Sequence, residues 1–233
     1  MVAVTASTAL MNRIYRRQRH IYDVTRKYYL LGRDRLIDRL DAKPSNGVLE
    51  IGCGTGRNLV LAARRYPGTH FFGIDVSTEM LTSAIEQIGR AGIAARVRVA
   101  HADATAFDPA RLFGRAQFER VFISYSLSMI PGWQAVLDNA IALLAPGGEL
   151  HIVDFGTQAR LPGLFRTLLR RWLALFHVTP RDTLETSLAR RAAETSAALT
   201  FERPYRTYAH YARFKRRREV TPPRYSAHGA GRS

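Results

Sequence analysis

The chain has 233 residues, of which 46% are hydrophobic and 10% are aromatic. This composition can bury the core of one α/β domain with short extensions, and no internal repeat divides the chain. The 35 Lys and Arg residues outweigh 19 Asp and Glu, and the net charge of +16 favours anionic partners, either a membrane or a nucleic acid. A single cysteine excludes a disulfide within the chain and fits a reducing cytosol.

We expect neither a secretory signal nor a membrane-spanning segment. Residues 2–10 lack a basic region, and arginines interrupt the apolar stretches before they reach the roughly 20 residues of a spanning helix. The expected location is therefore cytoplasmic, with peripheral association at the inner face of the cytoplasmic membrane. We expect no metal site.

The expected elements alternate between helices and strands along the chain. A helical region at about 11–40 is followed by strands at 47–51, 71–75, 97–101, 120–124 and 150–155, with helices at 57–65, 77–90 and 133–144. This order predicts parallel strands joined by right-handed crossovers, hence an α/β fold with helices on both faces of a sheet. Ligands of such sheets bind at the carboxyl ends of the strands.

Residues 48–56 (VLEIGCGTG) form an apolar run that leads into a loop with glycine at every second position. Gly52, Gly54 and Gly56 give G-x-G-x-G rather than the G-x-G-x-x-G of dinucleotide sites. Such a loop can bring backbone N–H groups close to a polar ligand. Glu50 would repel a pyrophosphate but suits a ligand that carries an ammonium and a sulfonium, so the loop favours S-adenosylmethionine over NAD.

Two further expected strands also end in carboxylates. Asp75 follows the glycine loop by about 20 residues, where nucleotide-binding units place their ribose ligand. Asp103 ends the next strand and precedes Ala104 and Thr105. Because the carboxyl ends of parallel strands share one edge of the sheet, we expect these carboxylates to lie near the glycine loop.

Residues 47–155 resemble the class I S-adenosylmethionine-dependent methyltransferases in the block 50–56, in Asp75 and in the segment 143–148 (LLAPGG). The resemblance implies a Rossmann-like, seven-stranded, mostly parallel sheet as the domain at 45–212. It also implies cofactor contacts by Glu50, Gly52, Cys53, Gly54, Gly56, Asp75, Val76, Met80, Asp103, Ala104, Thr105 and Ser124. No Asn-Pro-Pro-Tyr or Asp-Pro-Pro-Tyr sequence follows the fourth strand, which disfavours methylation of adenine in nucleic acid.

Outside this core, residues 15–33 and 121–131 are similar to the bacterial betaine-lipid N-methyltransferases, as are 176–180 and 204–209. That resemblance implies trimethylation of the amino group of diacylglyceryl-homoserine to diacylglyceryl-trimethylhomoserine, after the enzyme that makes the homoserine lipid, a possible partner. Residues 1–44 would form a helical cap over substrate and cofactor. Residues 213–233 would be a basic, disordered tail that attracts anionic lipid rather than nucleic acid.

An apolar stripe in residues 161–176 favours contact with a membrane. The stripe follows helical spacing, and Arg166, Arg170 and Arg171 interrupt it, as in a helix that lies in a lipid interface. An ordinary helix that covers the sheet would show the same stripe, so both interpretations stay open. The apolar members are Leu164, Phe165, Leu168, Leu169, Trp172, Leu173 and Phe176.

Methyl transfer to an amine asks the protein mainly to align nitrogen, methyl and sulfur and to exclude water. Tyrosines can stabilise the growing quaternary ammonium by cation–π contact, and arginines can bind the homoserine carboxylate. The catalytic candidates are Tyr22, Tyr29 and Tyr125, and the substrate-binding candidates are Arg26, Tyr28, Arg33, Ser126, Tyr205 and Tyr208. Each tyrosine can equally pack at the edge of the core, and isolated histidines such as His20, His151 and His177 are more often structural.

Two other functions remain possible on the sequence. The acceptor can be phosphatidylethanolamine or a quinone precursor instead of the homoserine lipid. Alternatively, the chain can be a basic RNA- or membrane-binding module without turnover, although the intact glycine loop and Asp75 argue against this.

Overall fold

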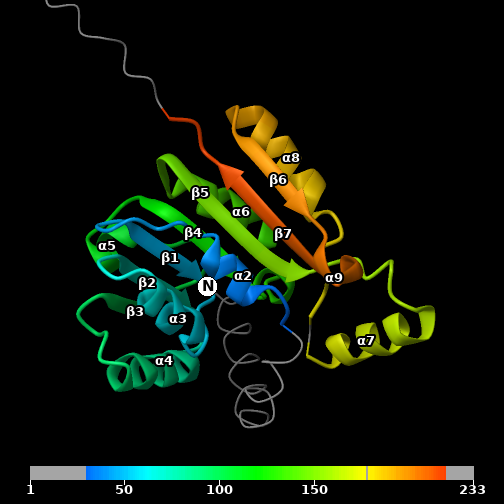
Figure 1. Cartoon of the computed structure of the whole chain (residues 1–233), viewed down its shortest axis with the longest axis horizontal. Coiled ribbons are helices and arrows are strands. Elements are labelled where there is room, and N and C mark those ends of the chain that lie inside the picture. The colour runs from blue at the N-terminus through cyan, green and yellow to red at the C-terminus, as the bar shows by residue number, and fades with distance from the viewer. Residues whose placement is uncertain (1–29, 177, 219–233) are drawn as a thin grey trace, which may run out of the picture.

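The structure is a computed structural model that describes residues 30–176 and 178–218. Its strands form one seven-stranded sheet in the order β3-β2-β1-β4-β5-β7-β6 (Figure 1). Strands β1 to β5 pair in parallel, whereas β7 is antiparallel to both β5 and β6. The strands are β1 (Gly47–Ile51), β2 (His70–Asp75), β3 (Val97–His101), β4 (Phe118–Ser124), β5 (Leu144–Phe155), β6 (Ala198–Glu202) and β7 (Ala209–Lys215). The expected α/β fold with a Rossmann-like, mostly parallel sheet is confirmed.

Helices cover both faces of this sheet and bury a separate apolar cluster on each. Neighbouring residues of β4 serve the two faces alternately, with Phe122 in the cluster under α2, α3 and α4 and Ile123 in the cluster under α5, α6 and α8. The helices are α2 (Arg33–Asp38), α3 (Arg57–Arg65), α4 (Thr78–Arg90), α5 (Pro109–Phe113), α6 (Trp133–Ala142), α7 (Gly163–Leu175), α8 (Leu184–Thr195) and α9 (Pro204–Thr207), with a 3-10 turn at Leu127–Met129. In Figure 1, α7 lies away from both faces, beyond the carboxyl end of β5.

Local sequence explains where the helices begin. Ser77 accepts a hydrogen bond from the N–H of Met80 and so caps α4, as its position before the helix predicts. Asp108 caps α5 in the same way, and Pro109 occupies the first helical position. The expected helix at 133–144 ends earlier, at Ala142, because β5 begins at Leu144 and bulges before its register with β4 resumes.

The expected domain boundaries need two corrections. Strand β7 continues to Lys215, so residues 213–215 of the expected tail belong to the sheet, where Arg213 pairs with His151. Residues 219–233 of the tail lie outside the described residues. Of the expected N-terminal helical region, 11–29 also lie outside them, and α2 covers 33–38. Leu36 of α2 is fully buried in the main apolar cluster, so this segment is part of the domain's core.

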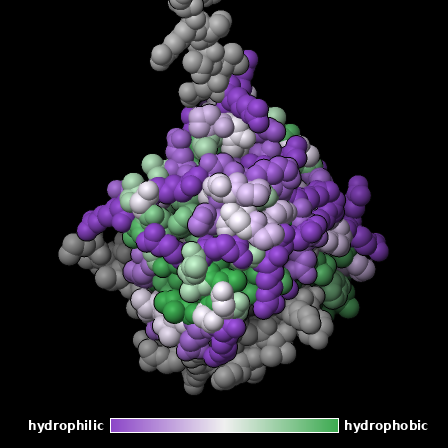
Figure 2. All heavy atoms as spheres, turned by 60° about the vertical axis from the view of Figure 1, so that its left-hand side comes forward, coloured by the Kyte–Doolittle hydropathy of each residue, from purple (hydrophilic) through white to green (hydrophobic). Residues whose placement is uncertain are grey.

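The face brought forward in Figure 2 is largely hydrophilic, as the high net charge predicts, and hydrophobic residues gather in its lower half. Within residues 30–176 and 178–218, none of the helices combines the length and apolar character needed to cross a bilayer.

Candidate functional site

The glycine loop after β1 has the backbone that its sequence requires. Gly52, Gly54 and Gly56 have φ angles of 75°, 53° and 77°, in the left-handed region that glycine adopts without steric cost. The N–H of Gly52 donates to the carbonyl oxygen of Ile74 at 2.9 Å and holds the loop against β2. A Cβ atom on Gly52 would lie 2.5 Å from the Cβ of Ser126, so a side chain does not fit between the loop and the end of β4.

Asp75 at the end of β2 fastens this loop from the other side. Its Oδ2 accepts the N–H of Gly54 at 2.7 Å, and its Oδ1 accepts the N–H of Ser77 at 2.9 Å. The carboxylate is therefore fixed beside the loop, in the position where a ribose diol would meet it. Val76 follows half-buried, and Met80 is buried in the first turn of α4.

A buried carboxylate lies directly beneath the loop. Glu50 is only 1% exposed, and its Oε1 accepts a hydrogen bond from Nδ2 of Asn58 at 2.7 Å. Burial raises the pKa of the neighbouring Cys53 thiol well above its ordinary value, and the charges of Asp75 and Glu50 add to the effect. A thiolate is thus disfavoured, so Cys53 is a small buried side chain and not a nucleophile.

The end of β3 supplies a second acidic corner. Oδ1 of Asp103 accepts hydrogen bonds from the N–H and the hydroxyl of Thr105, at 2.8 and 2.7 Å. The carbonyl of Ala104 accepts from Nδ2 of Asn139 in α6 at 3.1 Å, which ties this corner to the helix that follows β4. The arrangement holds Asp103 in one orientation and fits the expected contact with an adenine amino group.

The end of β4 faces the glycine loop through two serines. The Ser126 hydroxyl donates to the carbonyl of Ile51 at 2.9 Å, so it joins the ends of β4 and β1. The Oγ of Ser124 is buried and has no hydrogen-bond partner among the described residues. Ser124 thus retains hydrogen-bonding capacity toward a ligand, whereas the Ser126 donor is already used.

Tyr125 lies between these serines and has a left-handed backbone, with φ of 55°. Its hydroxyl donates to the carbonyl of Leu31 at 2.6 Å, and the residue is 2% exposed. Burial raises the pKa of the Tyr125 hydroxyl well above its ordinary value. Tyr125 therefore holds the segment before α2 against the sheet, and a direct catalytic role for it, which stays a prediction, would require the bond to Leu31 to open.

Three aromatic rings form a wall at this edge of the sheet. Phe155 packs edge-on against Tyr125 and Tyr208, with ring centroids 4.7 and 6.0 Å apart. We call Tyr125, Phe155 and Tyr208 the aromatic wall. Burial raises the pKa of Tyr208 to about 12, so its phenol stays neutral at physiological pH.

Two further candidates lie next to the aromatic wall. Arg33 and Tyr205 are close enough to Tyr125 to influence the pKa of its hydroxyl. Arg33 is 8% exposed at the start of α2, whereas Tyr205 is 43% exposed and its ring approaches the backbone of Gly32. The structure therefore brings together an arginine and three tyrosines that are far apart in the sequence.

Backbone strain concentrates at this edge. Five of the eight described non-glycine residues with positive φ are here: Tyr125, Gln158, Tyr205, Arg206 and Thr207. Such conformations cost about 1–3 kcal/mol each and cluster at functional sites. Gln158 is also fully buried, and neither polar atom of its amide has a hydrogen-bond partner among the described residues.

A buried acid and an arginine hold the loop after β4, and neither was singled out in the sequence. Burial raises the pKa of Asp154, although its Oδ2 accepts the N–H of Ser128 at 3.0 Å. Arg181 donates to the carbonyls of Leu127 and Ile130 at 3.2 and 2.8 Å. Asn58 and Asn139 were missed as well, although an asparagine just after the glycine loop was a usable signal.

The remaining candidates divide between two locations. Tyr22, Arg26, Tyr28 and Tyr29 lie outside the described residues, as do His20 and His177, and their roles stay predictions. His151 lies within β5, where it is 3.3 Å from Glu149 and 2.9 Å from the hydroxyl of Tyr211, a structural position.

Comparison with known proteins agrees with this geometry. Residues 48–148 match the family model described as "Methyltransferase domain". The chain is 33% identical over 117 residues to trans-aconitate 2-methyltransferase of Paracidovorax citrulli, which covers 50% of this chain and 42% of the relative. It is 32% identical over 128 residues to phosphoethanolamine N-methyltransferase 1 of Triticum aestivum, covering 54% of this chain and 24% of the relative. The chain spans about half or less of the length of these curated relatives.

Solved structures share the fold at low sequence identity. Phosphoethanolamine N-methyltransferase 2 of Haemonchus contortus, in complex with S-adenosyl-L-methionine, has a TM-score of 0.64 at 18% identity, covering 80% of this chain and 52% of the other. A geranyl diphosphate methyltransferase in complex with the same cofactor has a TM-score of 0.60 at 15% identity, covering 80% of this chain and 84% of the other.

The fold is that of the class I S-adenosylmethionine-dependent methyltransferases, and residues 48–148 match the model of a methyltransferase domain. The cofactor indicated for this site is S-adenosylmethionine. The left-handed glycines leave room for close backbone approach, and the buried Glu50 and fixed Asp75 offer the negative charges that this cation with a ribose requires.

Proposed function

We propose that the chain is an N-methyltransferase that trimethylates the amino group of diacylglyceryl-homoserine to give diacylglyceryl-trimethylhomoserine. The observation that carries this proposal is the aromatic wall with Arg33 and Tyr205 beside it, at the same edge of the sheet as the glycine loop. Aromatic faces attract a quaternary ammonium by about 0.5–2 kcal/mol each. A guanidinium suits the carboxylate that accompanies this nitrogen in the homoserine head group.

Four of the cofactor residues have a definite part in this proposal. Asp75 would hold the ribose hydroxyls, and Glu50 would favour the positive charge of the methionine part from beneath the loop. Asp103 would accept from the adenine amino group, since Thr105 already fixes its Oδ1. Ser124 would face the region of the transferred methyl.

When bound, S-adenosylmethionine supplies an electrophilic methyl group on a sulfonium. The neutral acceptor nitrogen would take up the methyl group with S-adenosylhomocysteine as the leaving group, and one proton would go to solvent after the first and second transfers but none after the third. An α-amino group with a pKa near ~8 supplies a useful neutral fraction, so a strong general base is not required. The aromatic wall would exclude water and attract the ammonium, whereas Arg33 would align the head group by its carboxylate.

The test is a reaction of the purified chain with labelled S-adenosylmethionine and vesicles that contain diacylglyceryl-homoserine, followed by mass analysis. We expect a product heavier by three methyl groups. Arg33→Gln should raise KM for the homoserine lipid and leave cofactor affinity unchanged. Cofactor binding without product on this lipid would contradict the proposed acceptor.

Two alternative acceptors are favoured by the names of two relatives. These are the phosphoethanolamine N-methyltransferase above and a demethylmenaquinone methyltransferase of Thermus thermophilus, which is 27% identical over 139 residues. Parallel reactions with phosphatidylethanolamine vesicles and with a quinone precursor would identify these alternatives. An RNA arm tests the binding-module alternative, which predicts salt-sensitive RNA binding and no heat of cofactor binding.

A further inference from the structure

Helix α7 carries an exposed aliphatic stripe along one side. With about 100° of rotation per residue, Leu164, Leu168 and Leu175 fall on one line along the helix. Their exposed fractions are 77%, 56% and 73%. The opposite side of α7 packs on the protein core, with Leu173 buried and Leu169 partly buried. The exposed stripe therefore takes no part in packing α7 on the core.

This concentration of exposed apolar side chains is local. Six large hydrophobic residues are exposed in the described part of the chain, and four of them are on α7. Tyr205 is the fifth and lies at the neighbouring strand-end edge, whereas Ile85 is isolated on α4. The four on α7 are Leu164, Phe165, Leu168 and Leu175. A contiguous exposed stripe of this kind marks an interaction surface, unlike single exposed apolar residues.

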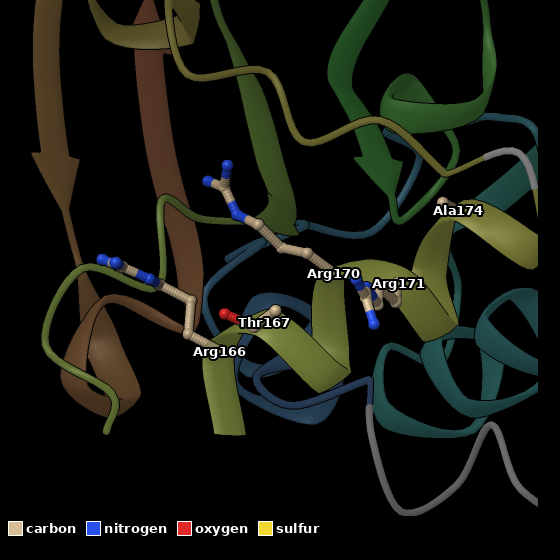
Figure 3. Close-up of a pocket in the computed structure, with 5 residues that line it drawn as sticks. All are labelled: Arg166, Thr167, Arg170, Arg171 and Ala174. Carbon is tan, nitrogen blue, oxygen red and sulfur yellow. The ribbon is translucent and has the colours of Figure 1, made fainter. Parts of the chain in front are cut away.

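The other exposed side of α7 is strongly basic. Arg166, Arg170 and Arg171, with Thr167 and Ala174, line a hollow of about 620 Å³. Figure 3 shows the arginine side chains leaving the helix, with those of Arg166 and Arg170 extending to the same side. The sequence has no acidic residue from 155 to 181 but five arginines, so α7 itself carries only positive charge.

One of the three arginines fixes the position of the helix. Arg170 donates to the carbonyl of Thr157 at 3.0 Å and lies 3.6 Å from a carboxylate oxygen of Asp182. Because Thr157 follows β5 directly, this contact places α7 next to the edge that carries the aromatic wall. Arg166 and Arg171 are the groups available to an external anion.

We propose that α7 is a docking surface for an anionic phospholipid bilayer. Leu164, Leu168 and Leu175 enter the boundary of the acyl chains, while Arg166 and Arg171 contact lipid phosphates. An aliphatic stripe flanked by arginines, on a helix too short to span, is the composition of a helix that lies in a lipid interface. The sheet-covering interpretation of residues 161–176 accounts for Leu173, which joins the core cluster, but not for the exposed Leu164 and Leu168, and Figure 1 shows α7 beyond the carboxyl end of β5.

Docking in this orientation brings the bilayer to the edge where the head-group nitrogen has to enter. The link to a lipid acceptor rests on the proposed function, whereas the docking itself rests on the surface of α7. Binding and catalysis can therefore be tested separately.

The experiment is flotation of the full chain with vesicles of phosphatidylcholine alone or with phosphatidylglycerol, an anionic lipid. We expect tight binding only to the anionic vesicles. Leu164→Ser/Leu168→Ser should weaken it at least about tenfold, and Arg166→Gln/Arg171→Gln roughly thirtyfold. Raised salt should weaken the wild type and have less effect on the arginine variant, because screening acts on the charged contacts.

Matched controls carry the same substitutions elsewhere on the surface. Ile85→Ser removes an exposed aliphatic side chain of α4, and Arg64→Gln/Arg111→Gln removes two exposed arginines of α3 and α5. Both should bind vesicles as the wild type does, apart from a small loss from net charge in the arginine control. Cofactor binding by calorimetry confirms that every variant is folded.

Two readouts separate docking from the proposed function. The leucine variant should lose activity on vesicles and retain it on the water-soluble deacylated homoserine ether. If the wild type methylates neither the lipid in vesicles nor the deacylated ether, the proposed acceptor is wrong. The flotation experiment still tests whether α7 docks on the bilayer. Equal vesicle binding by the wild type and the leucine variant would overturn the proposal. So would a wild type that does not bind vesicles but forms a dimer, if the leucine substitutions dissociate that dimer.

Discussion

Substitution of Gly52 by alanine probes the contact between the glycine loop and the end of β4. The new Cβ would lie 2.5 Å from Cβ and 2.6 Å from Oγ of Ser126, closer than real Cβ contacts. Rotation of Ser126 cannot remove the Cβ–Cβ overlap, so the backbone must shift. Overpacking of this kind costs about 1–3 kcal/mol, and a left-handed non-glycine residue costs about 1–2 kcal/mol more.

We therefore expect Gly52→Ala to lower the free energy of unfolding by about 3 kcal/mol and Tm by about 6–12 °C. The double variant Gly52→Ala/Ser126→Gly should relieve this overlap and recover part of the lost stability. Without the Ser126 side chain, the nearest atom of residue 126 is its Cα, 4.0 Å from the new Cβ. The two substitutions should thus couple favourably by at least ~1 kcal/mol in a double-mutant cycle. Cofactor affinity should fall in the single variant.

The assay is urea unfolding of the four proteins of the cycle, with calorimetry for the cofactor. Gly89→Ala is the control, because nothing lies within 4 Å of a Cβ at that helical position. It should be neutral or stabilise α4 by about 0.5–1 kcal/mol. Additive effects of the Gly52 and Ser126 substitutions within about 0.5 kcal/mol would refute the steric argument.

Three further predictions follow from single contacts. Asp75→Asn should raise Kd for S-adenosylmethionine roughly 10–100-fold, because hydrogen bonds to a charged group are worth about 1.5–3 kcal/mol. Calorimetry measures this Kd, and an unchanged value would contradict the proposed ribose contact. Tyr125→Phe should lower the free energy of unfolding in urea by about 1 kcal/mol, because the 2.6 Å hydrogen bond to the carbonyl of Leu31 is lost. The pH profile of kcat should stay unchanged. An altered profile would instead show that the Tyr125 hydroxyl takes part in proton transfer. Acid should destabilise the chain in two steps. Burial lowers the pKa of His151 below 6.5, so stability falls as pH drops below that value. His151, 3.3 Å away, and then Lys215 lower the pKa of Glu149 from 4.5 to about 2, so a further ~1–3 kcal/mol is lost below pH 4.5. In thermal melts at a series of pH values, His151→Gln should remove the loss of Tm below pH 6.5, and Glu149→Gln should remove the further loss below pH 4.5. An unchanged dependence of Tm on pH in both variants would exclude this pair as the cause.

The cofactor half of the fold was predictable because its signals are local. Strands 47–51 and 97–101 were placed with the bounds that the structure shows, since an apolar run before Gly52 marks the first and alternating valines shortly before Asp103 mark the second. The glycine loop and the carboxylates of Asp75 and Asp103 follow directly from those strand ends. Their convergence at one edge is a consequence of parallel pairing, which the alternation of elements already implied.

The acceptor side depends on contacts that spacing does not contain. Strands β6 and β7 were not located, because their short segments mix charged and apolar residues within an antiparallel pair. The hydroxyl of Tyr125 meets a carbonyl 94 positions earlier in the chain, and the ring of Tyr208 meets Phe155 only after α7 and α8 have intervened. The position of α7 off the sheet could not be deduced, because one apolar stripe suits either a sheet or a bilayer.

The chain leaves the sheet edge at the end of β5 and returns to it at the start of β7. The two ends of this excursion are joined by backbone bonds from Gly156 to Tyr208 and from Gln158 to Thr207, both 2.8 Å long. The segment between them, which includes α7, α8 and β6, therefore begins and ends at one point of the sheet edge, and the family match at 48–148 stops before it. A chimera joined at these two junctions must bring its own strand to pair with β7 and its own α8, whose Leu184 and Leu188 are fully buried, and it tests whether this segment determines the methyl acceptor.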